Sequence, residues 1–171
     1  MPFLLRAVIL WLHFLAASIW IGGLVFQVLV VFPTLARATP SAERMRLALS
    51  LEARFRVFVW PVVGLVLFTG LVNLMHVWYA TVVTAGSIPI SPTFIPVLSL
   101  KLSLVVGMIA LQAVQQFLVQ PRRVAALRAW SAGGQDVPLS LRQWHRLALS
   151  LYSALVGLAG SVVLCAVLLR G

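Results

Sequence analysis

Three ionisable side chains lie inside long apolar stretches of this sequence: His13, His76 and Lys101. An ionisable group in hydrocarbon costs a few kcal/mol, so it usually faces a partner, a cofactor or a water-filled cavity. Two imidazoles on facing helices can ligate a haem iron axially inside a helix bundle. A histidine with a nearby thioether can instead hold copper(I), because soft ligands select it. These residues are therefore the first candidates for a functional site.

The sulfur atoms available to such a site come from Met75, next to His76, and from Met108, two turns along from Lys101. Neighbouring side chains on a helix point about 100° apart, so Met75 and His76 cannot both face one metal well. A lysine here could pair with an anionic group, such as a haem propionate or a substrate carboxylate. The candidate metal ligands are thus His13, His76 and Met108, and the candidate haem-binding residues are His13, His76 and Lys101.

Each candidate also has a purely structural interpretation, which the sequence leaves open. His13 could hydrogen-bond a neighbouring helix, and His76 could be an ordinary residue of the interfacial aromatic belt. Lys101 could extend its ammonium group to the headgroups, and Met108 could be a core residue. The sequence contains no nucleophile–base pattern, phosphate-binding loop, HExxH motif or cysteine-rich metal motif, and its single cysteine excludes an intrachain disulfide.

The elements that must position these residues follow from composition. The chain has 171 residues, of which 62% are hydrophobic and 9% charged, whereas a soluble domain carries roughly a quarter charged residues. Lipid offers no water to bond the backbone N–H and C=O groups, so apolar stretches that cross it must be helices, and about 20 residues span a bilayer. The sequence therefore predicts one all-α domain over residues 1–171, a four-transmembrane-helix bundle of a polytopic membrane protein. Its helices are expected at about 7–32, 57–83, 97–119 and 147–169.

The net charge of +10 is concentrated in two of the three connections between these helices. Arginines crowd the first and third connections, while residues 84–96 of the second carry no charge, which is the positive-inside pattern. Connections one and three are thus expected in the cytoplasm, and both termini outside. The arginines are expected to contact the anionic lipid of the bilayer rather than nucleic acid. At 1.5 Å rise per residue, His13, His76 and Lys101 then lie within roughly 10 Å of the outer hydrocarbon boundary.

The first connection is expected to hold an interfacial helix over about 40–56, or to extend the second spanning helix below the membrane. Glu52 and Arg56 have the i,i+4 spacing of a helical ion pair, and Pro61 should start or kink the spanning helix. All three acidic residues are expected in cytoplasmic connections, which argues against a carboxylate proton relay in the membrane. His145 is expected at the cytoplasmic end, away from the other candidates.

Short motifs in the first two helices carry a resemblance to a known family: Leu12-His13, Trp20-Ile21-Gly22-Gly23, Arg54-Phe55 and Thr69-Gly70-Leu71. From His13 through the fourth helix, the chain resembles the copper resistance protein D (CopD) family. That resemblance implies a multi-pass protein of the bacterial inner (plasma) membrane involved in copper homeostasis or transport. It also implies a metal site near the periplasmic side, with His13 as the residue carried over.

The chain is also similar to HemJ-type protoporphyrinogen oxidases, which share the four-helix plan, an early histidine and a lysine early in the third helix. His13 and Lys101 match those two positions, and the resemblance implies haem b and oxidation of a porphyrinogen. A third alternative is a non-catalytic membrane subunit of a larger complex. The sequence leaves open whether the cofactor is copper or haem b and whether the protein is an enzyme. It also leaves open whether the chain forms a homo-oligomer or binds a partner subunit.

Overall fold

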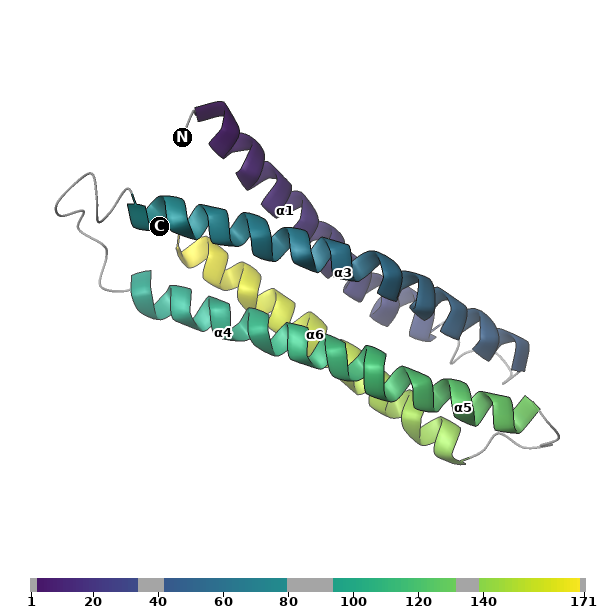
Figure 1. Cartoon of the computed structure of the whole chain (residues 1–171). Coiled ribbons are helices and arrows are strands. Elements are labelled where there is room, and N and C mark those ends of the chain that lie inside the picture. Colours follow the sequence, from purple (N-terminus) through teal and green to yellow (C-terminus); the bar gives the residue numbers. More distant parts are fainter. Residues whose placement is uncertain (1–2, 34–41, 80–93, 132–138, 170–171) are drawn as a thin grey trace.

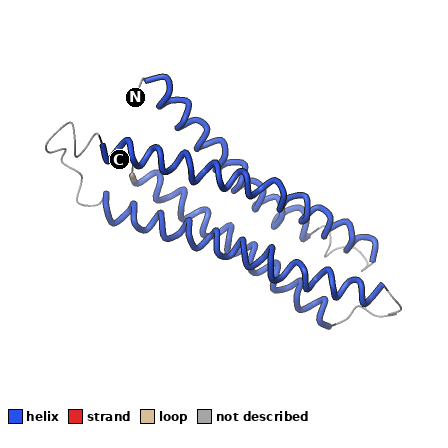
Figure 2. Tube along the Cα trace, in the orientation of Figure 1, coloured by secondary structure: helices blue, strands red, loops and turns tan. Residues whose placement is uncertain are grey.

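The computed structural model describes residues 3–33, 42–79, 94–131 and 139–169, and this part of the chain is almost entirely helical (Figure 2). Helix α1 (Phe3–Phe26) continues into a π-helical segment, η1 (Gln27–Val31). Helix α3 spans Ala42–Tyr79. Helices α4 (Phe94–Ala113) and α5 (Gln120–Ser131) are joined without a break by the π-helical η3 (Val114–Val119), and α6 spans Leu139–Leu168.

These helices form two antiparallel pairs that lie against each other (Figure 1). α1 packs mainly on α3, and α4 packs mainly on α6. Both termini lie at one end of the bundle, together with the end of α3 and the start of α4. We call residues 3–19, 64–79, 94–108 and 156–169 the terminal half of the bundle. The other described residues form the arginine half, named for the basic residues in α3, α5 and α6.

Four helices in the described residues are long and apolar enough to cross a membrane, which confirms the predicted all-α bundle with four candidate spans. Large apolar side chains cover the outside of the bundle, for example Phe68 on α3, Val106 on α4 and Leu164 on α6. In water such a surface would aggregate, whereas in a bilayer it faces lipid tails. The four helices are therefore compatible with a multi-pass membrane protein.

The helices are longer than the sequence predicted. α3 begins at Ala42 and continues past Pro61, so residues 42–56 extend the second spanning helix and do not form a separate interfacial helix. Pro61 neither starts nor ends α3, although its ring removes one backbone hydrogen bond from the helix. The third helix runs on to Ser131, and α6 starts at Leu139. The uncharged second connection lies largely outside the described residues.

The core lies where the two helix pairs meet, and small residues let them approach closely. Ala148 and Ala159 on α6 are completely buried, as are Leu24 on α1 and Leu155 on α6. Gly23 lies directly against the ring edge of Phe55, in a position where any side chain would clash. Close approach at small residues is the usual basis of helix packing in membranes. Gly23 thus lets α1 and α3 pack closely against each other in the arginine half.

Candidate functional site

The imidazole of His13 is held by α3 through its Nδ1 atom. This nitrogen lies 3.1 Å from the carbonyl oxygen of Val66 and 3.0 Å from the hydroxyl oxygen of Thr69. A carbonyl can only accept, so Nδ1 must carry the proton. The Thr69 hydroxyl donates its own proton to the carbonyl of Leu65 at 2.6 Å, which leaves its oxygen able to accept from His13. In the neutral ring, Nε2 is therefore the atom with a free lone pair.

A glycine makes room for this ring. A Cβ added at Gly70 would lie 3.2 Å from Cε1 and 3.6 Å from Nδ1 of His13. The adjacent pair Thr69-Gly70 thus supplies both a hydrogen-bond acceptor and the space beside it. These two residues belong to one of the motifs singled out in the sequence, and the structure gives that motif a physical role: it orients His13.

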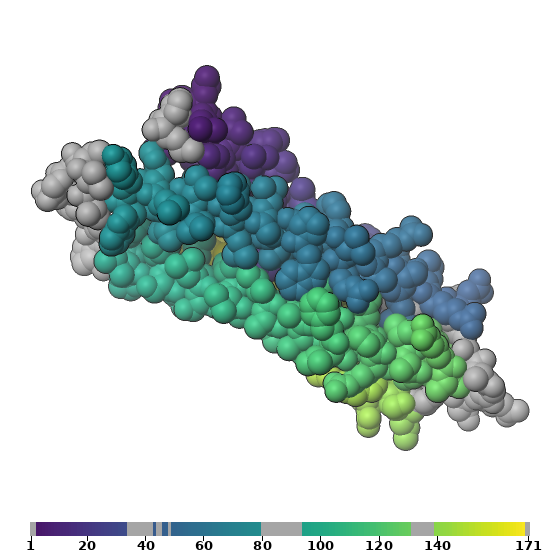
Figure 3. Space-filling model, viewed as in Figure 1, coloured from purple at the N-terminus to yellow at the C-terminus, as the bar shows by residue number. Residues whose placement is uncertain are grey.

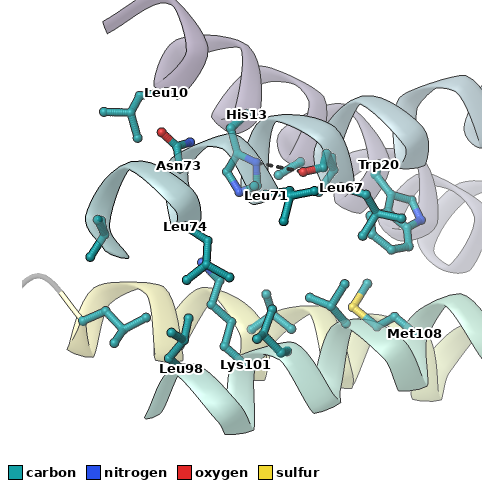
Figure 4. A pocket seen from close by; sticks show the side chains of 18 of the residues that line it. Leu10, His13, Trp20, Leu67, Leu71, Asn73, Leu74, Leu98, Lys101 and Met108 are labelled. Carbon is teal, nitrogen blue, oxygen red and sulfur yellow. Dashed lines mark hydrogen bonds between the residues drawn. The ribbon is translucent and has the colours of Figure 1, made fainter. Parts of the chain in front are cut away.

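A pocket of about 650 Å³ lies between the helices of the terminal half, beside His13. Its lining is mostly aliphatic and aromatic, and the polar side chains on its walls are His13, Asn73 and Lys101. Figure 4 shows the second ring nitrogen of His13 directed towards the pocket and Lys101 reaching from α4 towards the wall formed by α3. In Figure 3 a small part of α6 is visible between α3 and α4 in this half of the bundle.

Three of the four residues predicted from the sequence meet at this pocket. His13 and Lys101 line opposite walls, and Met108, which is 1% exposed, lies further down on α4 near Trp20 (Figure 4). His76 is half-buried near the end of α3 and is not among the residues that line the pocket. Within the described residues no group of three or more His, Cys, Asp or Glu side chains could hold a metal ion.

A second polar centre, which sequence reasoning missed, lies in the arginine half. Nη1 of Arg123 is 2.6 Å from each carboxylate oxygen of Glu52, and the two side chains are 0% and 2% exposed. Nη2 of Arg123 lies 3.3 Å from Nδ1 of His145, which must accept because a guanidinium only donates. Phe32 packs beside this centre, with its ring 5.3 Å from that of His145.

This centre corrects two expectations. The i,i+4 spacing predicted that Glu52 pairs with Arg56, but its ion pair is with Arg123, 71 residues away in the sequence. The prediction that every acidic residue lies in a connection is wrong for Glu52, which is buried within α3. Spacing along one helix could not reveal a partner on another helix.

Sequence reasoning also missed a buried row of glutamines on α4, η3 and α5: Gln112, Gln115, Gln116 and Gln120. The signal was present, because these residues recur every three or four positions and lead to Arg123, as one face of a helix would. Gln27 on η1 is buried as well.

Comparisons of the chain with protein-family models, with curated proteins and with solved structures find no match.

Proposed function

We propose that the pocket of the terminal half binds haem b and that the protein is a membrane redox protein in which His13 would hold the iron. The orientation of His13 carries this proposal. A metal-ligating histidine almost always donates its other ring N–H to a carbonyl or a similar acceptor, which fixes the ring and raises the basicity of the ligating nitrogen. His13 has this arrangement, with Nδ1 bonded to Val66 and Thr69 and Nε2 towards the pocket.

The pocket fits the chemistry of a haem. Its volume of about 650 Å³ lies in the range of cofactor pockets, which are mostly apolar with a few placed polar groups. Lys101, on the wall opposite His13, can pair with a propionate. A bound haem would supply one-electron chemistry. The chain would orient its iron through His13, hold its anionic edge through Lys101 and exclude water with the aliphatic side chains around them.

The distribution of charge supports a sidedness for this site. Positive-inside asymmetry favours an orientation with the arginine half at the cytoplasmic face and both termini at the periplasmic face of a bacterial inner membrane. The pocket then lies in the periplasmic half of the bilayer. The resemblance to the CopD and HemJ families supports the same membrane, and the HemJ resemblance supports a porphyrinogen as the oxidised substrate.

Copper homeostasis is the second candidate, and Met108 is the observation that favours it. Its thioether and the imidazole of His13 line the same pocket, and both suit copper(I). The CopD resemblance supports the same conclusion. A single ion does not need a large apolar cavity, however, so the size of the pocket favours haem. The non-catalytic subunit remains a third candidate, which requires no cofactor.

A visible spectrum of the detergent-purified protein, with metal analysis of the same sample, separates these candidates. Cells should be supplied with haem precursors and copper, and the spectrum recorded before and after dithionite. We expect a Soret band that shifts on reduction, is lost in His13→Ala and is retained in the control His76→Ala. A colourless protein with stoichiometric, His13-dependent copper would support copper homeostasis. If neither cofactor is found and His13→Ala only lowers the stability of the protein, the non-catalytic subunit would be supported.

A further inference from the structure

The interior of the arginine half contains several buried polar side chains. Five glutamines, each at most 5% exposed, line its interior: Gln27, Gln112, Gln115, Gln116 and Gln120. They lie between the pocket and the Glu52–Arg123 ion pair. A lipid-facing surface surrounds them, so their amides cannot reach bulk water through the sides of the bundle.

Most polar atoms of these amides have no hydrogen-bond partner among the described residues. Neither polar atom of Gln112 or Gln116 is bonded, and neither are Oε1 of Gln27 and Oε1 of Gln120. Nε of Arg123 and the indole nitrogen of Trp60 are buried without a partner in the same part of the structure. Buried polar groups nearly always have a partner, and where protein atoms do not supply one, ordered water does.

Two π-helical segments carry three of these glutamines. η1 starts at Gln27, and η3 contains Gln115 and Gln116. Such segments are rare and frequently mark functional sites. Their i→i+5 hydrogen bonds place more residues in each turn than an α-helix does. Helices α4, η3 and α5 form one continuous rod. Positions four apart, such as Gln112, Gln116 and Gln120, therefore stay closer to one face of this rod than they would in an α-helix.

The buried glutamines follow one another along the chain from the bottom of the pocket towards Arg123. Gln112 lies one turn beyond Met108 at the bottom of the pocket, where the indole nitrogen of Trp20 is also buried without a partner. At the opposite end, Tyr152 lies beside Gln115, and Arg123 contacts His145.

We propose that ordered water fills the arginine half along these glutamines and forms a hydrogen-bonded passage from His145 to the bottom of the pocket. Amides suit such a passage, because each offers both a donor and an acceptor and none carries a charge that would trap an ion. Protons can cross it by hopping, in which each water accepts a proton on one side and releases another on the far side, with no change in oxidation state. The passage does not depend on which cofactor the pocket binds.

Cysteine accessibility in membrane vesicles tests the passage on the protein without cofactor. In a Cys165→Ala background, Gln112→Cys and Gln116→Cys should react with silver ion or aminoethyl methanethiosulfonate, because a thiol reacts through its thiolate, which forms in water. Val119→Cys is the matched control, since Val119 lies on the same rod, is 2% exposed and belongs to the apolar core. We expect both glutamine positions to react at least about tenfold faster than Val119→Cys. Equal rates would mean that the glutamines form a dry network and would overturn the proposal.

A second measurement needs no substitution in the row. Hydroxyl-radical footprinting labels side chains that lie next to bound water, so Tyr152, although 1% exposed, should be modified within about tenfold of the rate of the exposed Tyr79. Absence of modification at Tyr152 would contradict the water-filled passage even if a cysteine variant had misfolded. Neither result depends on haem or copper, so the passage and the proposed function can fail separately.

Discussion

His13 on α1 lies against Gly70 on α3 so closely that a methyl group added at Gly70 would meet the imidazole carbon Cε1 at 3.2 Å. One residue earlier on α3, the hydroxyl of Thr69 lies 3.0 Å from Nδ1 of the same ring. The ring is thus held by hydrogen bonds at Nδ1 and fits against α3 because Gly70 has no side chain. Its remaining nitrogen is directed to the pocket by the packing of α1 on α3, and not by the rotamer of His13 alone.

Gly70→Ala should weaken haem binding by displacing the ring of His13. A contact of 3.2 Å requires a shift of a few tenths of an ångström, and we expect a loss of about tenfold in affinity, equivalent to about 1.4 kcal/mol. The measurement is a haem titration followed at the Soret band. Gly64→Ala is the matched control on the same helix, because nothing lies within 4 Å of its added Cβ. Equal affinities of the two variants would show that the ring has room to move.

Thr69→Val should lower haem affinity while leaving the volume of the side chain nearly unchanged. The substitution removes one of two acceptors from Nδ1 of His13, and loss of such a partner typically costs 10- to 100-fold in metal affinity or activity, roughly the range expected here. Thr69→Ser keeps the hydroxyl and should bind as the wild type does. If Thr69→Val binds haem as tightly as the wild type does, the hydroxyl of Thr69 would not be what orients His13.

Lys101→Met should reduce affinity for haem but not for haem whose propionates are esterified. The flexible side chain of methionine fills similar space, and only the charge is removed. A titration of wild type and variant with both ligands isolates the pairing between ammonium and carboxylate as a double-mutant cycle would. An equal loss for both ligands would indicate that Lys101 acts through packing alone.

Arg123→Ala should strongly destabilise the bundle, because the carboxylate of Glu52 would remain buried without its partner. Breaking a buried pair on one side costs about 3–5 kcal/mol. Replacement of both residues, as in Glu52→Leu with Arg123→Met, should restore much of the loss. Thermal unfolding in detergent measures both, with the exposed Arg142→Ala as control. A double variant less stable than Arg123→Ala alone would contradict the assigned cost of the unpaired charge.

The fold could be predicted because the lengths of apolar stretches determine the number of membrane helices. Position along the helix axes could be predicted as well, since each residue rises a fixed distance along a helix, and His13, Lys101 and Met108 line one pocket. The rotation of each helix about its own axis could not be predicted. On α3 the residues Gly70, Asn73 and Val77 line the pocket, whereas His76 points about 120° away from Gly70 around the helix axis. Only the packing of α1 on α3 determines which side faces inward.

The buried ion pair shows the other limit of the sequence. Arg123 looked like one of several basic residues of a cytoplasmic connection, and Glu52 had a closer apparent partner in Arg56. The packing of α3 against α5 brings Arg123 to Glu52, and the apolar pattern of the sequence does not report which residues meet there. The row of glutamines could have been found from its spacing, because uncharged amides on a regular helical face within a membrane span require partners.

The most direct test of the haem proposal is chemical rescue of the proposed iron ligand. His13→Gly removes the imidazole and leaves a space of the same shape beside Gly70, Val66 and Thr69. We expect that this variant lacks the wild-type Soret and reduced spectra when haem is supplied, and that free imidazole added to the sample restores them. A His13→Gly protein that shows the wild-type spectrum without imidazole would contradict the assignment of His13 as the ligand.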